Sequence, residues 1–215
     1  MAARTARDRR RRSLGQNFLV DRALAERMAA TVTTGELVLD LGAGTGALAI
    51  PLAEAGARVV AVEADPIWAR RLDRGLAGSG LTVEVVVADI LAVPLPTEPY
   101  RVVASPPFGV TTALMRRLLD RPDLGPYRAD LLVQWEVARK RCELPPSTLL
   151  STTWAPWWEM TIVERVSRTA FAPVPRIDAG WIEVKRRIPH LLPSRLAPDF
   201  ARLVRAEWDH RPGVP

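Results

Sequence analysis

The residues of this chain best suited to hold a ligand lie in one short stretch. Residues 37–41 read as a buried strand, and Gly42, Gly44 and Gly46 then form a turn before a helix expected over 47–55. Alternating glycines let a backbone turn tightly and approach a bound molecule with no side chain in the way. The stretch therefore predicts a nucleotide-type binding turn, and the alternative is an ordinary connection between a strand and a helix.

Two acids near this turn narrow the class of ligand. A dinucleotide fingerprint spaces its glycines G-x-G-x-x-G, whereas the spacing here is G-x-G-x-G and follows Asp40. This arrangement favours S-adenosylmethionine over NAD. The next expected strand, 57–63, ends in Glu63, whose carboxylate is placed to accept hydrogen bonds from ribose hydroxyls.

A second candidate loop, Ser105-Pro106-Pro107-Phe108, follows the strand expected over 100–104. Ligands of open α/β sheets bind beyond the carboxyl ends of the strands, so this loop should face the same crevice as the glycine turn. Two prolines stiffen the loop and leave the carbonyls of Ser105 and Pro106 free as acceptors. Phe108 offers a flat apolar face for an aromatic ring. The alternative is a stiff turn that carries a core phenylalanine.

The elements that must position these loops alternate along the chain. Continuously apolar strands favour a parallel sheet covered on both faces, and the alternating pattern of 159–167 and 180–186 favours an antiparallel pair at the end of that sheet. We therefore predict an α/β, doubly wound, mostly parallel seven-stranded sheet. The expected parallel strands are 37–41, 57–63, 82–88, 100–104 and 130–135, and the expected helices are 21–31, 47–55, 66–77, 111–120 and 198–208.

Composition excludes several classes of protein. The 215 residues are 48% hydrophobic, enough for one core, and no apolar run has the length of a membrane span. The N-terminus lacks the apolar core of a signal peptide, so we expect a cytoplasmic protein. Cys142 is the single cysteine, which excludes an internal disulfide, and His190 and His210 suggest no metal site.

Charge is concentrated at the N-terminus. Residues 1–12 hold six arginines and one acid, a charge of +5 out of the total of +6. Such a segment cannot bury enough apolar surface to fold alone. We expect a disordered basic arm over 1–12 that binds phosphates, and the alternative is a solubilising extension. Residues 13–187 form the expected main domain, and 188–215 form a short Pro-rich segment with one helix.

Four motifs together resemble one family. The loop 105–108 resembles the catalytic loop of amino-group methyltransferases, and 14–19 (LGQNFL) resembles the opening motif of the rRNA adenine-N6 methyltransferases. Residues 134–141 (QWEVARKR) are similar to that family's Q-x-E-x-A-x-R stretch, and 171–178 (FAPVPRID) to its F-x-P-x-P-x-V-D segment. The resemblance is greatest to the Erm-type enzymes, which act on 23S rRNA and confer macrolide resistance.

The resemblance implies a class I S-adenosylmethionine-dependent methyltransferase fold and a role for particular residues. Glu63 would accept the ribose hydroxyls, Asp89 would receive the adenine amino group, and Gln16 would help hold the methionine end of the cofactor. Ser105, Pro106 and Phe108 would act in catalysis. The full set implied to bind S-adenosyl-L-methionine is Gln16, Asn17, Leu19, Gly42, Gly44, Glu63, Ala64, Asp89, Ile90 and Ser105.

The resemblance further implies a monomeric enzyme, without a membrane or metal requirement, that methylates the N6 of an adenine in 23S rRNA. The alternatives are a small-subunit rRNA adenine dimethylase and a non-catalytic RNA-binding protein that keeps the fold. Two features depart from the family pattern. Ser105 stands where the family usually has Asn, and only about 28 residues follow Arg187 where Erm-type enzymes carry a helical domain. The basic clusters 139–141 and 185–187 are therefore expected to help hold RNA.

Overall fold

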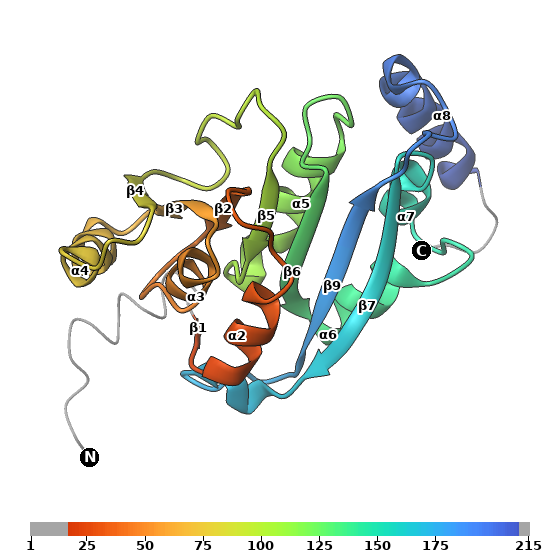
Figure 1. The fold of residues 1–215 in the computed structure, drawn as a ribbon. Helices are drawn as coiled ribbons and strands as arrows, with labels where there is room; N and C mark the ends of the chain where they lie inside the picture. Colours follow the sequence, from red (N-terminus) through yellow and green to blue (C-terminus); the bar gives the residue numbers. More distant parts are fainter. Residues whose placement is uncertain (1–16, 211–215) are drawn as a thin grey trace.

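The computed structural model describes residues 17–210. Its main sheet has seven strands in the order β4-β3-β2-β5-β6-β9-β7, and helices cover both of its faces (Figure 1). The five strands from β4 to β6 are parallel. Their bounds, followed by those of β7 and β9, are β2 Leu37–Leu41, β3 Arg58–Glu63, β4 Val83–Val87, β5 Arg101–Ala104, β6 Arg128–Gln134, β7 Trp158–Val166 and β9 Ala179–Arg186.

The end of the sheet also follows the prediction. Strand β9 pairs antiparallel with β6, and β7 pairs antiparallel with β9. The α/β fold class, with a mostly parallel seven-stranded sheet and an antiparallel final pair, is confirmed.

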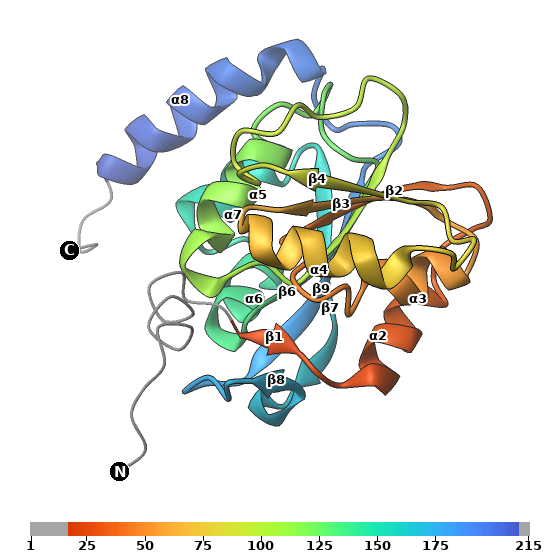
Figure 2. The ribbon, with the colours of Figure 1, turned by 90° about the vertical axis from the view of Figure 1, so that its left-hand side faces the viewer.

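Two layers of helices enclose the sheet (Figure 2). One layer packs the apolar faces of α2 (Arg22–Ala29), α3 (Ala49–Glu54) and α4 (Pro66–Leu76) onto one side of the strands. The other side is covered by α5 (Thr111–Leu119), α6 (Trp135–Cys142) and α7 (Leu149–Trp154), and α8 (Ala197–Asp209) packs on α7 at one end of the molecule. Successive strand residues point to opposite faces, so Val102 and Val103 of β5 belong to different cores.

Helices α6 and α7 were not predicted. Only Ala138 of α6 is fully buried, and its sequence WEVARKRC is dominated by charged residues, so it has no apolar stripe long enough to indicate a helix. The helix expected over 198–208 is present as α8, which packs against α7.

Tryptophans fill the core on the α5–α8 side. Trp154, Trp157 and Trp158 are each only 1% exposed. Each indole N–H donates a hydrogen bond: Trp154 to Asp120, and the other two to main-chain carbonyls. These side chains therefore serve packing and no ligand site.

A small second sheet brings the N-terminal segment over the glycine turn. Strand β1 (Phe18–Leu19) pairs antiparallel with β8 (Phe171–Ala172). The Phe18 ring lies so close to Gly44 that a Cβ on that glycine would stand 2.9 Å from it. The segment 171–178, noted in the sequence for its resemblance alone, thus has a structural role, because it holds β1 in place.

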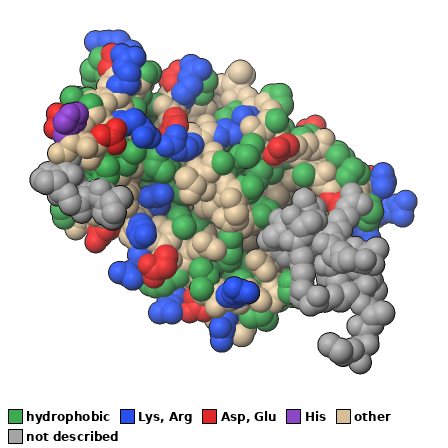
Figure 3. All heavy atoms as spheres, turned by 180° about the vertical axis from the view of Figure 1, so that it is seen from behind, with side chains coloured by type: hydrophobic (Ala, Val, Ile, Leu, Met, Phe, Trp, Pro, Cys, Tyr) green, Lys and Arg blue, Asp and Glu red, His purple; other side chains and the backbone are tan. Residues whose placement is uncertain are grey.

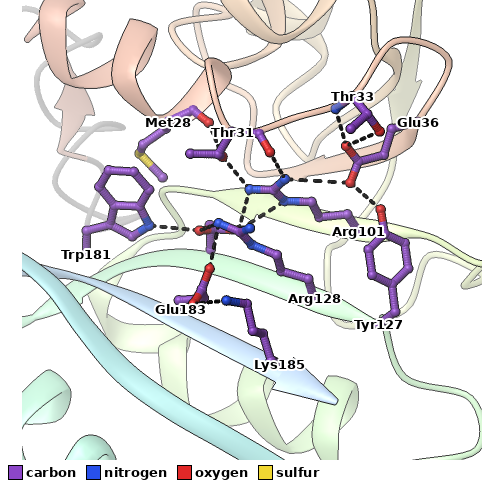
Figure 4. A network of polar contacts seen from close by, with 11 residues as sticks. Met28, Thr31, Thr33, Glu36, Arg101, Tyr127, Arg128, Trp181, Glu183 and Lys185 are labelled. Atoms are coloured by element: carbon purple, nitrogen blue, oxygen red, sulfur yellow. Dashed lines mark hydrogen bonds and ion pairs between the residues drawn. The ribbon is translucent and has the colours of Figure 1, made fainter. Parts of the chain in front are cut away.

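A buried polar network fixes α2 against the sheet (Figure 4). The guanidinium of Arg101 donates to Asp130 and also to the main-chain carbonyl of Thr31, just after α2. Asp130 is fully buried and accepts further bonds from Arg128 and from the indole N–H of Trp181. Because α2 follows β1 directly, this network also anchors the N-terminal segment. Other members extend it toward solvent: Glu36, Tyr127, Glu183 and Lys185.

Candidate active site

The glycine turn has the conformation that its sequence predicts. Gly42, Gly44 and Gly46 have φ angles of 94°, 54° and 86°, in the left-handed region that side chains rarely adopt. The amides of Gly42 and Ala43 both donate to the carbonyl of Val62. The turn is thereby tied to the end of β3, where Glu63 follows.

Glu63 is the central polar residue of the site. Its side chain is 3% exposed, and its two oxygens accept hydrogen bonds from the amides of Gly44 and Asp65, both at 2.8 Å. These bonds fix the carboxylate in one orientation. An ionised carboxylate has about four acceptor positions, so two remain for a bound molecule.

One cavity brings most of the predicted residues together. Asp40 and Glu63 form its polar floor, and β1 forms one wall. Eight of the ten residues predicted to hold the cofactor line it: Asn17, Leu19, Gly42, Glu63, Ala64, Asp89, Ile90 and Ser105. Gly44 is covered by Phe18 and reaches the site through its bond to Glu63. Gln16 lies outside the described residues.

The turn after β4 carries the residues predicted to recognise adenine. Asp89 lies exposed at the cavity rim, and its Oδ1 accepts the amide of Leu91 at 2.8 Å. Ile90 is buried beside it. Arg117 of α5 donates to the carbonyls of Leu91 and Val93, so the turn is anchored to the helix that follows the second candidate loop.

That second loop lies across the cavity from Glu63. Ser105 is half-buried and lines the cavity, and within residues 17–210 no side chain hydrogen-bonds its hydroxyl. Pro106 is buried; its Cα would lie 3.7 Å from a Cβ on Gly42. The hydroxyl of Ser105 is thus available to a ligand on the side of the glycine turn.

Phe108 begins a single 3-10 turn over Phe108–Val110 and is half-buried. Its ring packs against Phe171, with centroids 5.9 Å apart and planes at 69°. It does not line the cavity itself. The structure therefore gives the ring a packing contact, as in the alternative reading of the sequence, while keeping it beside the Ser105 loop.

Asp40 is a site residue to which the sequence analysis gave no role. It is 1% exposed, it lines the cavity, and its Oδ2 lacks a hydrogen-bond partner among the described residues. Burial, with the nearby charge of Glu63, raises the pKa of Asp40 to about 8. The signal in the sequence was an acid inside an otherwise apolar strand, because such an acid needs a reason to be buried.

The raised pKa of Asp40 predicts how pH affects stability. The folded protein keeps a proton on Asp40 that the unfolded chain loses above its ordinary pKa of 3.8, so the free energy of unfolding should fall as pH rises from about 4 to 8. Asp40→Asn should remove this part of the decline. Urea unfolding at pH 5 and pH 8 measures it, with the exposed Asp73→Asn on α4 as control. An identical pH dependence in wild type and Asp40→Asn would contradict the prediction.

Half of the residues in the two basic clusters expected to hold RNA, Arg141, Arg186 and Arg187, are half-buried and engaged within the structure, while Arg139, Lys140 and Lys185 are exposed, so a role of these exposed cations in holding RNA stays a prediction. Arg186 donates to the carbonyl of Gly125, and Arg187 to that of Ala155. Arg141 is half-buried with its guanidinium 5.8 Å from the Trp154 ring. On the face opposite to that of Figure 1, Lys and Arg side chains lie among acidic and apolar side chains (Figure 3). Arg141, Arg186 and Arg187 contact carbonyls and aromatic rings that lie near them in space. The sequence alone does not show these neighbours.

Within residues 17–210 we find neither a reactive cysteine nor a metal-binding group. Burial raises the pKa of the Cys142 thiol to about 12, which makes it unreactive. Between residues 17 and 210 there is no group of His, Cys, Asp and Glu side chains arranged to hold a metal ion. The same region has no helix long and apolar enough to cross a membrane.

Comparison with known proteins agrees with this geometry. Residues 7–209 match the family of ribosomal RNA adenine dimethylases. The chain belongs to this family. The resemblance drawn from the four motifs is thereby confirmed, and the motifs fall at the cavity, on β1 and β8, and on α6.

Two curated relatives illustrate the similarity. The mycinamicin-resistance protein MyrB of Micromonospora griseorubida is 45% identical, over 91% of this chain and 62% of its own length. An rRNA methyltransferase of Streptomyces thermotolerans is 39% identical, over 99% of this chain and 71% of its own length. This chain thus spans less than two thirds of the length of MyrB.

Solved structures agree at the level of the fold. The crystal structure of the 23S rRNA methyltransferase ErmE superposes with a TM-score of 0.80 at 33% identity, covering 92% of this chain and 81% of that one. A dimethyladenosine transferase from Plasmodium falciparum has a TM-score of 0.79 at 21% identity, which shows the shared fold alone.

Proposed function

We propose that this chain transfers methyl groups from S-adenosyl-L-methionine to the exocyclic N6 of an adenine in 23S rRNA, and so gives resistance to macrolide-type antibiotics. The observation that carries the proposal is that the Ser105-Pro106-Pro107 loop and the Glu63 carboxylate line the same cavity. The names of MyrB and ErmE support the substrate and the resistance. We further propose that the protein acts as a monomer in the cytoplasm.

The cavity fits the cofactor chemically. Two free acceptor positions on Glu63 match two ribose hydroxyls, and the exposed Asp89 carboxylate with buried Ile90 matches an adenine amino group and ring face. Asp40 has an unpaired oxygen in the cavity lining, which can hydrogen-bond a polar group of the ligand. When bound, S-adenosylmethionine supplies an electrophilic methyl group on a sulfonium.

Ser105 and Pro106 address the main chemical difficulty of the reaction. The N6 lone pair of adenine is delocalised into the ring, so the amine is a weak nucleophile. The Ser105 hydroxyl and the Pro106 carbonyl can accept the two N6 hydrogens and favour a pyramidal nitrogen whose lone pair points at the methyl group. The nitrogen gains the methyl carbon, the sulfur keeps the bonding electrons, and an N6 proton leaves to solvent. Positioning supplies the rate, and no strong base is required.

The target adenine must leave its stack to reach this loop. We propose that Phe108 replaces part of the lost stacking. The arm of residues 1–12 lies outside the described residues, and we propose that its six arginines bind rRNA phosphates without sequence preference. In this reading residues 13–187 form the methyltransferase domain and 188–215 a short C-terminal segment.

The proposed function is tested by methyl transfer from labelled S-adenosylmethionine to 23S rRNA. Wild type should label an adenine N6, Ser105→Ala should lose most activity while keeping cofactor affinity, and Ser105→Asn should retain activity. Mass analysis of the modified nucleoside gives the ratio of mono- to dimethyl product. A wild-type protein that binds rRNA and cofactor without transfer would favour the non-catalytic alternative. Labelling of 16S rRNA alone would favour the small-subunit dimethylase.

Phe108→Ala tests the stacking role separately. Loss of the ring should cost about 1–3 kcal/mol, the value of one base–aromatic stack, or roughly 5- to 150-fold in kcat/KM for rRNA. The Kd for S-adenosylmethionine should stay within a factor of two or so. Since the ring also packs on Phe171, Phe108→Leu is the matched control: it keeps apolar packing and should still lose the stacking. Full activity of both variants at subsaturating rRNA would contradict the role.

A further inference from the structure

A second cavity lies at the opposite ends of the central strands from the candidate active site. It is formed by the segment that enters β5, by the connection from α5 to β6, and by the end of β9. Its volume of about 580 Å³ exceeds the roughly 240 Å³ of the first cavity and lies within the range of small-molecule sites, roughly 300–1,000 Å³. None of its residues contacts the cofactor or the adenine in the proposed reaction, although Arg117 also anchors the turn that carries Asp89.

Two arginines in this cavity have no acidic partner. Arg117 and Arg186 are half-buried, and both donate hydrogen bonds to main-chain carbonyls: Arg117 to those of Leu91 and Val93, and Arg186 to that of Gly125. Each Nε is buried without a hydrogen-bond partner among residues 17–210. Carbonyls hold the two guanidiniums in place, and the Trp158 ring lies 5.7 Å from that of Arg186, but neither arginine is in an ion pair with a carboxylate among residues 17–210.

The carboxylates that line the cavity are already engaged. Glu98 pairs with Arg58 at 2.9 Å, and Asp123 pairs with Arg121 at 3.4 Å. Desolvation lowers the pKa of Arg186, which shows that its environment disfavours the charge despite the field of Asp123. A bound anion would offset this cost, because a half-buried cation is stabilised by an opposite charge in contact with it.

The remaining walls suit a flat ring. They consist of apolar and aromatic side chains, and Arg121 stands at the cavity with a side chain that is 68% exposed. Proline and tyrosine faces can pack against a nucleobase while arginines contact its phosphate. The residues that provide these faces are Leu95, Pro96, Pro99, Leu124 and Tyr127.

We propose that this cavity is a second binding site for a nucleoside phosphate, held by Arg117, Arg121 and Arg186 through its phosphate and by the proline and tyrosine walls through its base. The same chemistry is offered by a free nucleotide and by a nucleotide of RNA. Binding of a free nucleotide is independent of the proposed methyl transfer, whereas binding of an RNA nucleotide rests on RNA being the substrate.

The probes are uridine 5′-monophosphate and inorganic pyrophosphate, titrated by calorimetry while excess S-adenosylhomocysteine fills the first cavity. Wild type should show one saturable site for the nucleotide. Arg121→Gln/Arg186→Gln should weaken it at least tenfold. The control Arg70→Gln/Arg74→Gln removes two exposed charges from α4, on the other layer, and should leave it unchanged. No saturable binding of either probe, or equal losses in both double variants, would overturn the site for free nucleotides.

Thr97→Glu provides an independent test in case the Arg121→Gln/Arg186→Gln variant fails to fold. Thr97 is exposed on the cavity wall, so a carboxylate there should repel phosphate without disturbing the core. Nucleotide affinity should fall at least tenfold, and unchanged affinity would overturn the proposal.

A second experiment uses a 23S rRNA fragment as the ligand. If RNA supplies the nucleotide, Arg121→Gln/Arg186→Gln should flatten the slope of log K against log salt by about 0.7 for each phosphate contact with a single strand. The rate of methyl transfer at saturating RNA should stay unchanged. An unchanged slope together with absent nucleotide binding would refute both sources. A wild type that binds the nucleotide but transfers no methyl group would leave this site standing and refute only the proposed function.

Discussion

Glu63→Gln is expected to weaken the binding of S-adenosylmethionine strongly. Its carboxylate orders the glycine turn through Gly44 and the start of α4 through Asp65, both at 2.8 Å. In the proposed complex it also accepts two ribose hydroxyls. Hydrogen bonds to a charged group contribute about 1.5–3 kcal/mol each, so losing two should raise the Kd for S-adenosylmethionine by roughly 100-fold or more. In this variant the NH2 group of the glutamine side chain would also face the backbone N–H of Gly44 or Asp65. Two donors repel each other, and this repulsion further weakens binding.

Calorimetry with S-adenosylmethionine measures this effect. Glu84→Gln provides the matched control, since Glu84 lies on the neighbouring strand β4 with its side chain exposed. Circular dichroism should show an intact fold in both variants, and rRNA affinity should be retained. Wild-type cofactor affinity in Glu63→Gln would show that the ribose is held elsewhere.

Asp130→Asn should lower the free energy of unfolding strongly. Asp130 is fully buried and accepts hydrogen bonds from Arg101, Arg128 and Trp181. Without its charge, Arg101 stays 2% exposed, and within the described part of the chain its one remaining ion pair is with Glu36, at 3.6 Å. Breaking one side of a buried ion pair costs about 3–5 kcal/mol, which urea unfolding can measure.

A double variant separates the buried charge from simple loss of packing. Arg101→Met/Asp130→Leu removes both charges and should recover part of the stability lost by Asp130→Asn, because no unpaired ion stays buried. As a surface comparison, Glu164→Gln breaks a partly exposed pair with Arg27 and should cost about 1 kcal/mol or less. A loss of that small size for Asp130→Asn would mean that water or relaxation compensates Arg101.

Local sequence determined the backbone of the candidate site. The glycines at 42, 44 and 46 adopt the left-handed conformations that only glycine takes at low cost. The rule that ligands meet the carboxyl ends of parallel strands then placed the Ser105 loop opposite Glu63. These features depend on short-range sterics and on strand direction, and both can be read from consecutive residues.

Tertiary structure alone decided what surrounds those residues. The pairing of β1 with β8 brings Phe18 over the glycine turn across more than 150 positions of sequence. The half-buried setting of Arg141, the unpaired oxygen of Asp40 and the counter-ion of Arg101 likewise come from distant elements. Burial and charge compensation depend on which groups meet in space, and a one-dimensional pattern records a residue's own chemistry but not that of its neighbours.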